Sequence, residues 1–326
     1  MPGLPAGPTT VVGRVEQNET RHNDPNHAVE RDAKKRAPHG VDGPRFARPI
    51  TPGERPSLIC REARQIKPAR DGHDPCGVSR SSGALKRPAK GSMTAREIHR
   101  HIQKLADPDK AKILQGFFKT GPGEYGEGDR FLGIVVPVIR KLVTQYQDTP
   151  ISEVMKLLKS VIHEERFLAV LMLVQRYEKG DDGLKKKTFD LYLKNIRFIN
   201  NWDLVDLSAP NIVGSYLTGR SRKPLYALAR SRDLWKRRIA IISTFAFIRR
   251  NEFADTLRIS GMLLADKHDL IHKAVGWMLR EVGKRDLSTE EGFLQRHYRS
   301  MPRTMLRYAI ERFPESKRQK YLNGKV

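Results

Sequence analysis

An aromatic residue and a carboxylate lie one helical turn apart in the segment NNWDLVD, residues 200–206. If this segment is helical, Trp202 and Asp206 project side by side, because positions four apart share one face of a helix. Asp203 is also near that face, but it falls between Trp202 and Leu204, where it can cap the helix or pair with a neighbouring arginine. Asp206 is therefore the preferred acid, and an ion pair that holds helices together is the structural alternative for either carboxylate.

The face that carries this pair recurs along the chain. From Arg166, the next marked positions follow after 36, 36, 35 and 30 residues, at Trp202, Arg238, Lys273 and Arg303. A period in the mid-thirties, with an apolar helix in each unit, is typical of a solenoid of HEAT-like helical pairs. We therefore expect an all-α fold, a right-handed α-solenoid of HEAT-like helical pairs with a basic concave face.

Each repeat presents a second residue one turn after its marked position. In chain order these residues are Val170, Asp206, Ile242, Trp277 and Arg307. If the solenoid is regular, the two sets form one continuous surface that is cationic and aromatic and contains one acid. The alternative is that they are ordinary first-turn residues that face solvent or a neighbouring helix. Trp235 precedes the register by three residues, which favours a place in the core.

The charge of the chain predicts a polyanionic partner. The sequence has 61 Lys and Arg against 37 Asp and Glu, a formal net charge of +24 and a pI near 10.2. Such a field suits nucleic acid, although charge alone would also suit an anionic membrane. No segment approaches the ~18 consecutive apolar residues of a spanning helix, and no secretory signal is evident. We expect an intracellular, cytoplasmic protein, associated with the nucleoid if it is bacterial.

The sequence gives no sign of a metal site or a disulfide framework. Both cysteines, Cys60 and Cys76, lie in the N-terminal region, so the expected folded part has none. Its scattered histidines lack the spacing of zinc ligands, and we interpret them as solvated helix residues. They include His163, His268, His272 and His297. No metal and no cofactor are expected.

Residues 1–92 differ in composition from the rest. They hold 12 of the 20 prolines, no Trp or Tyr and one Phe, Phe46. Such a composition cannot bury a core, which predicts a disordered Pro/Arg-rich extension. With 17 basic and 10 acidic residues, it accounts for only +7 of the +24 charge. The extension either adds nonspecific phosphate contacts or has no role, and Met93 is an alternative start of the domain.

Residues 93–326 are predicted to form one helical domain. Thr94 and Glu97 have the spacing of a capping box before the first helix. The loop GPGEYGEGD, residues 121–129, contains four glycines and two glutamates. It does not match a known phosphate-binding spacing, and its acids would repel phosphate. We interpret it as a mobile loop beside the first helices.

Several ordered motifs resemble one known family over roughly residues 94–322. They are FFKTGPGEYGEGDRFLGIVVP, NNWDLVD, WKRRIAIISTF, DLIHKAVGWMLREVGKR and MPRTMLRYAIERF. The chain closely resembles the AlkD-like DNA alkylation repair proteins, which are HEAT-like-repeat DNA glycosylases. Its GPGEYGEGD loop is longer than in the shorter members, so contacts in that region do not transfer in detail.

The resemblance implies roles for individual residues. The catalytic carboxylate corresponds to Asp206, and the two active-site tryptophans correspond to Trp202 and Trp277. The nearby arginine corresponds to Arg238, with Arg237 as the alternative if the register is off by one. The DNA-contacting arginine one turn after the second tryptophan corresponds to Arg280.

Together, these observations predict a monofunctional alkylpurine DNA glycosylase. It would act as a monomer on double-stranded DNA with cationic N3- or N7-alkylated purines and leave an abasic site. The resemblance implies that the base is not enclosed, which would tolerate bulky adducts. The expected DNA-binding residues are Arg237, Arg166, Lys273, Arg280, Arg303 and Arg307. Two alternatives remain: a non-catalytic HEAT-repeat protein that binds damaged or structured DNA, and a scaffold that binds proteins. A scaffold would have an apolar or mixed-sign concave face.

Overall fold

The computed structural model describes residues 93–326, and the predicted N-terminal extension lies outside the described residues. The described part is built from helices, and its one β-bridge joins Arg130 to Ile162. The first half contains α2 Ala95–Gln103, α3 Pro108–Phe117, α4 Val136–Gln145, α5 Ile151–Leu157, α6 His163–Lys179, α7 Asp182–Lys194, η2 Ile196–Phe198 and α8 Trp202–Ser208. The second half contains η3 Pro210–Gly214, α9 Ser215–Leu217, α10 Lys223–Ala229, α11 Leu234–Ser243, α12 Phe245–Ile248, α13 Ala254–Met262, α14 Asp269–Gly283, α15 Leu287–His297, α16 Arg303–Ala309, η4 Ile310–Arg312 and α17 Glu315–Leu322.

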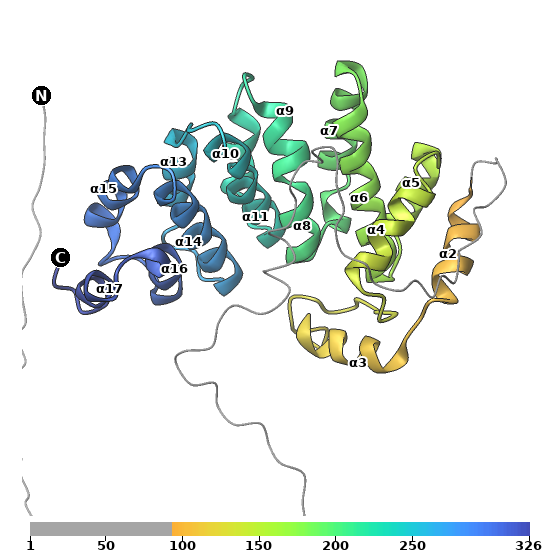
Figure 1. Ribbon diagram of the computed structural model, residues 1–326, viewed down its shortest axis with the longest axis horizontal. Helices are drawn as coiled ribbons and strands as arrows, with labels where there is room; N and C mark the ends of the chain where they lie inside the picture. The colour runs from red at the N-terminus through yellow and green to blue at the C-terminus, as the bar shows by residue number, and fades with distance from the viewer. Residues whose placement is uncertain (1–92) are drawn as a thin grey trace, which may run out of the picture. The chain divides into compact units, whose positions relative to one another are not determined.

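One row of helices runs through this domain. Helix α6 packs on α8, α8 on α11, α11 on α14 and α14 on α16. A second set flanks the row, with α7 against α6, α10 against α11 and α13 and α15 against α14. Figure 1 shows the pairs following one another in chain order. The all-α fold is confirmed as a solenoid of stacked helical pairs, in which each apolar helix face is covered by a neighbour.

The five marked positions occupy equivalent places in this row. Arg166, Trp202, Arg238, Lys273 and Arg303 lie in or near the first turn of α6, α8, α11, α14 and α16. A single long apolar core runs beneath them. Aliphatic and aromatic side chains fill it, because burial of apolar surface between successive helices is favourable. The repeat spacing therefore located the helices correctly.

The equivalent places do not form one continuous exposed surface. Val170 and Ile242 are fully buried, and the arginines Arg166 and Arg238 are only 4% and 5% exposed. This corrects the expected surface. Sequence period fixes where a residue lies on its helix, whereas the neighbouring helix or loop decides whether that position is covered.

Two local features of the sequence shape the start of α2 and the end of α8. The predicted capping box is confirmed, because the Glu97 amide donates to the Thr94 hydroxyl and the Thr94 amide donates to the Glu97 carboxylate at 2.8 Å. After α8, Pro210 begins the π-helical turn η3. Proline has no amide hydrogen to continue the α-helical pattern, so the chain changes its hydrogen bonding there.

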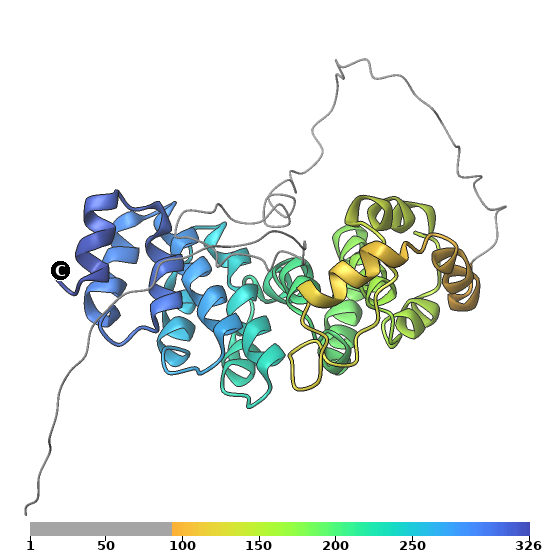
Figure 2. The same cartoon turned by 90° about the horizontal axis from the view of Figure 1, so that it is seen from below.

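Helix α3 and the 121–129 loop stand apart from the row. None of the residues of α3 is fully buried, and Figures 1 and 2 show α3 beneath the lower ends of the neighbouring helices. The Arg130–Ile162 bridge joins the residue after this loop to the residue before α6. Among the described residues, no helix is long and apolar enough to cross a membrane.

Candidate active site

Asp206 and Arg238 form a two-pronged ion pair between α8 and α11. The Arg238 Nε donates to Asp206 Oδ1 at 2.9 Å, and Nη2 donates to Oδ2 at 2.7 Å. The same guanidinium also donates to the backbone carbonyl of Leu270 on α14. Arg238 therefore ties together three successive helices of the row while it fixes the plane of the carboxylate.

The side chain of Asp206 is largely buried but keeps some exposed surface. It is 15% exposed, compared with 6% for that of Arg238. Burial raises the pKa of Asp206 above its ordinary value, while the adjacent Arg238 guanidinium acts in the opposite direction. Arg238 is the cation that favours the ionised form by direct contact, through its two hydrogen bonds to the carboxylate.

Arg237 points away from this pair. Its Nε donates to Asp266 at 2.6 Å, and its Nη1 donates to the carbonyls of Ser231 and Arg232. These contacts resolve the ambiguity between the two adjacent arginines, since only Arg238 reaches Asp206. Arg237 holds the loop before α11 and the loop before α14, so we do not propose a DNA contact for it.

Trp202 lies one turn before Asp206 and is partly exposed. Its ring stacks on Phe118 with centroids 5.2 Å apart and planes 13° from parallel, and Phe117 meets it edge-on at 6.0 Å. Asn201 caps the helix by accepting the Trp202 amide at 2.8 Å. One indole face is therefore supported by the N-terminal part of the domain.

Trp277 is also partly exposed, on α14. Its indole N–H donates to Glu281 at 3.2 Å, and its ring lies 6.0 Å from that of Phe245 at a tilt of 48°. Glu281 in turn pairs with Lys284. These contacts fix the ring without burying it. Both predicted tryptophans thus retain exposed surface, as does Trp235, which was expected in the core.

The other predicted DNA-binding cations divide into two groups. Arg166 is buried and pairs with Asp129 at 2.7 Å, and Arg280 is 7% exposed and pairs with Glu311. We do not propose phosphate contacts for these two, because their guanidinium groups serve packing inside the domain. Lys273, whose side chain is 41% exposed, pairs with its own helix neighbour Asp269. Arg303 and Arg307 are both exposed on α16.

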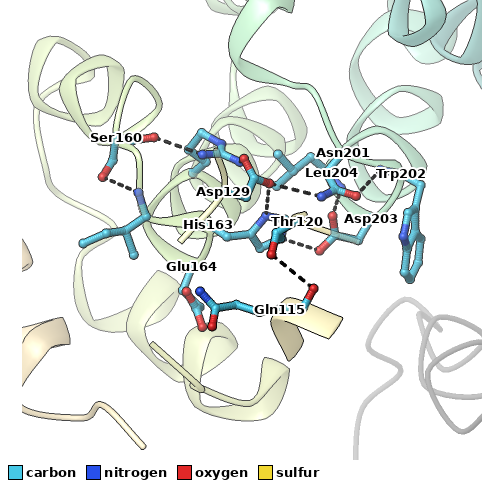
Figure 3. Close-up of polar contacts among 12 residues, drawn as sticks. Gln115, Thr120, Asp129, Ser160, His163, Glu164, Asn201, Trp202, Asp203 and Leu204 are labelled. Atoms are coloured by element: carbon cyan, nitrogen blue, oxygen red, sulfur yellow. Dashed lines mark hydrogen bonds and ion pairs between the residues drawn. The ribbon is translucent and has the colours of Figure 1, made fainter. Parts of the chain in front are cut away.

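The first turn of α6, with the sequence HEER, anchors the N-terminal part of the domain. His163 Nδ1 lies 3.2 Å from Asp129 of the loop, and its Nε2 lies 2.7 Å from Asp203 of α8 (Figure 3). Asn201 donates to the same Asp129 at 3.1 Å. Glu164 accepts backbone amides from residues 132–134. This buried polar cluster joins the loop, α6 and the start of α8.

The sequence interpretation of His163 is therefore wrong, since the side chain is only 3% exposed. Its partner Asp129 is 34 residues away, and the spacing of residues gave no sign of the contact. The same network accounts for Asp203, which bonds both His163 and the Leu204 amide. Asp203 is bound within this buried network, whereas Asp206 pairs with Arg238, and their side chains are 12% and 15% exposed.

The charge of His163 predicts a dependence of stability on pH. Burial disfavours the imidazolium, but Asp203 and Asp129 more than offset this and raise the pKa of His163 to about 9. The resulting stabilisation is fully present below pH 6.5 and is lost as the pH rises through about 9. It is on the order of 3 kcal/mol.

We expect the free energy of unfolding of the native protein to fall between these pH values. The variant His163→Gln should be less stable at neutral pH and should lack that part of the decline. Denaturant unfolding at several pH values measures both effects, with His297→Gln as a control outside the network. An equal pH dependence in the native protein and His163→Gln would show that His163 carries no stabilising charge.

The 121–129 loop is tied down at several points. The Glu124 carboxylate accepts the Gly121 amide and the Glu127 carboxylate accepts the Gly123 amide, both at 3.0 Å. The two acids thus bind amides of their own loop, so these two amides do not point to a free anion site. Its end at Asp129 is buried in the ionic cluster, which anchors a loop that was expected to be mobile. Within the described residues, no group of three or more His, Cys, Asp or Glu side chains has the geometry to hold a metal ion.

Comparison with known proteins identifies the family. Residues 98–313 match the family described as DNA alkylation repair enzyme. The chain belongs to this family. The matched region runs from α2 to the end of η4 and includes both tryptophans, the ion pair and the 121–129 loop. Membership gives this DNA alkylation repair enzyme a role in the repair of alkylated DNA, and hence DNA as its macromolecular partner.

A solved structure has a similar fold. It is described as a predicted DNA alkylation repair enzyme from Enterococcus faecalis, and it is 15% identical to this chain with a TM-score of 0.50. The match covers 64% of this chain and 97% of that one. At this identity the likeness concerns the fold alone. No curated protein matches the chain.

Proposed function

We propose that this member of the DNA alkylation repair enzyme family is a monofunctional DNA glycosylase. It would hydrolyse the N-glycosidic bond of cationic N3- and N7-alkylated purines in duplex DNA and leave an abasic site. The observation that carries the proposal is the Asp206 carboxylate, oriented by Arg238, on a side chain that is 15% exposed and one turn from Trp202. A protein that only attracts phosphates gains nothing from an accessible acid at such a place.

The chemistry of the substrate explains why one carboxylate suffices. Alkylation at N3 or N7 makes the purine a cation, so the base leaves as a neutral molecule with the electron pair of the glycosidic bond. No general acid is needed for that departure. The positive charge that develops on the sugar is what the enzyme must stabilise, and an ionised Asp206 can do so electrostatically. It can also orient the water that attacks C1′, with the water proton released to solvent.

The two tryptophans supply surfaces for the cationic lesion and the sugar. An indole face attracts a cation by about 0.5 to 2 kcal/mol. Trp202 already has one face on Phe118, so its remaining surface is the part that a lesion can meet. Trp277 is held by Phe245 and Glu281. Because these rings are already held in place, they lose little side-chain entropy when the substrate binds.

The exposed cations of the row are suited to phosphate contacts. Lys273, Arg303 and Arg307 lie on α14 and α16, beyond the ion pair. We propose that they bind the DNA backbone and set its register, since phosphate contacts position a duplex without reading its sequence. No lysine is marked as a Schiff-base nucleophile, in keeping with hydrolysis alone. We propose that the enzyme works as a monomer in the cytoplasm without a cofactor.

One observation favours a second candidate, a protein that binds damaged DNA without catalysis. The Asp206–Arg238 pair joins α8 to α11, and a bridge of this kind can serve packing alone. The two candidates differ in which alkylated purines they predict to be released from DNA. A glycosylase that relies on a cationic leaving group must distinguish a charged purine from a neutral one, whereas a binding protein releases neither.

The test compares two duplexes of one sequence, one with N7-methylguanine and the other with neutral O6-methylguanine. In a buffer with a metal chelator, we expect free base from the first duplex only, measured by chromatography against a no-enzyme control. Release of both bases would contradict the role of the charged leaving group. Tight binding without release of either base would replace the glycosylase by the binding protein.

A further inference from the structure

Tyr125, near the tip of the 121–129 loop, contacts the predicted catalytic face of the domain. Its ring meets Trp235 of α11 edge-on, with centroids 6.2 Å apart and planes at 74°. Its hydroxyl interacts with Trp202 of α8, whose indole N–H is the only hydrogen-bonding group of that side chain. Lys273 of α14 lies within its electrostatic reach. A residue from the N-terminal part thus contacts α8 and α11 and lies near a cation of α14.

The backbone around Tyr125 holds it in this place. The Gly126 amide donates to the Lys119 carbonyl at 3.0 Å. A Cβ added at Gly126 would lie 2.4 Å from the Phe118 carbonyl oxygen, so only glycine permits the close approach. At the end of the loop, Asp129 is bound by Arg166, His163 and Asn201 (Figure 3). The loop is therefore fixed on both sides of the tyrosine.

Tyr125 adds bulk beside the residues proposed to act on the lesion. Phe118 covers one face of Trp202, Phe117 meets its edge, and Tyr125 stands at its indole nitrogen. Asp206 lies one turn further along the same helix. A substituent that projects from the purine toward the first turns of α8 and α11 would therefore meet the phenol ring.

We propose that Tyr125 is a specificity-determining residue that limits the size of the alkyl group on the target purine. This inference rests on the proposed glycosylase function and on the same site. It differs from the expectation that an open face tolerates bulky adducts, because the 121–129 loop places the Tyr125 ring beside Trp202 and Trp235. A methyl group fits beside the ring, whereas a benzyl group competes with it for space.

The experiment uses the full chain and two duplexes, which carry N7-methylguanine or N7-benzylguanine. Both kcat/KM for base release and Kd for the duplex are measured for the native protein, Tyr125→Ala and Tyr125→Phe. We expect Tyr125→Ala to raise the benzyl-to-methyl ratio of kcat/KM by about tenfold, in the range for steric discrimination of small groups. The Kd ratio should shift in the same direction. Tyr125→Phe keeps the ring and should keep the native ratios.

Two controls separate this role from a loss of structure. Pro122→Ala changes an exposed residue of the same loop and should leave both ratios at native values. Gly126→Ala displaces the loop next to the tyrosine and should shift the ratios as Tyr125→Ala does. Unchanged ratios in Tyr125→Ala, with native-like thermal unfolding, would overturn the proposal.

The two measured quantities, kcat/KM and Kd, distinguish failure of the size-limiting role of Tyr125 from failure of the proposed glycosylase function. If the native protein binds both duplexes but releases no base, the glycosylase function fails, and the Kd ratio still decides the role of Tyr125. If it releases N7-methylguanine and neither ratio responds to Tyr125→Ala, only the size-limiting role fails.

Discussion

Asp206→Asn is expected to reduce the release of N7-methylguanine by about 10³-fold. The amide has nearly the shape of the carboxylate but lacks the charge that stabilises the developing sugar cation. Affinity for duplex DNA should stay equal or increase, because a negative charge is removed near the phosphates. Single-turnover release and fluorescence anisotropy measure these two quantities on the same oligonucleotide.

The matched control for this substitution is Asp203→Asn. Asp203 lies in the same helix and bonds His163, so its replacement should lower stability while it leaves the chemical step within a small factor. Release at a near-native rate in Asp206→Asn would show that Asp206 is the wrong carboxylate. Loss of DNA binding in that variant would show that the ion pair with Arg238 serves only the packing of α8 against α11.

Arg238→Gln should change the pH dependence of base release more than it changes the affinity of the protein for DNA. Because Asp206 must be ionised, release should fall at acid pH as this carboxyl becomes protonated. Burial raises the pKa of Asp206, and Arg238 opposes that shift. Removal of the guanidinium therefore raises this pKa further, and we expect the acid limb of the rate profile to move to higher pH. At neutral pH, release should fall by about 10²-fold.

The salt dependence of DNA binding distinguishes this role from a phosphate contact. The side chain of Arg238 is 6% exposed and bound to Asp206, so Arg238→Gln should leave the salt slope unchanged. Arg307→Gln, at an exposed position, should reduce the slope by about one. A flattened slope in Arg238→Gln would show that this arginine binds a phosphate. Loss of one partner of a buried ion pair costs about 3 to 5 kcal/mol, so unfolding is measured alongside.

The sequence predicted the elements of the fold because its signals are local. Apolar periodicity and the repeat spacing located α6, α8, α11, α14 and α16, and the Thr94 capping box placed the first helix. Asp206 and Trp202 were found together because four-residue spacing on a helix fixes their common face. Arg238 lay in the equivalent position of the next repeat, which brings it opposite Asp206.

The burial of individual charges could not be predicted in this way. Arg166 and Arg280 have the same kind of position as the exposed cations, but Asp129 and Glu311 from distant segments cover them. The same applies to His163, whose carboxylate partners are 34 and 40 residues away. In the sequence, Tyr125 is distinguished only as an aromatic residue among glycines. Its contact with Trp235 depends on a loop crossing to another repeat.

The most direct test of the central claim follows the alkyl group itself. A duplex with one N7-methylguanine, isotopically labelled in the methyl carbon, is incubated with excess protein in chelated buffer, and all products are analysed by mass. We expect the label to leave as free 7-methylguanine and the strand to retain an abasic site. Label on the protein or on a small molecule, with unmodified guanine restored in the strand, would show direct removal of the alkyl group and contradict glycosidic hydrolysis.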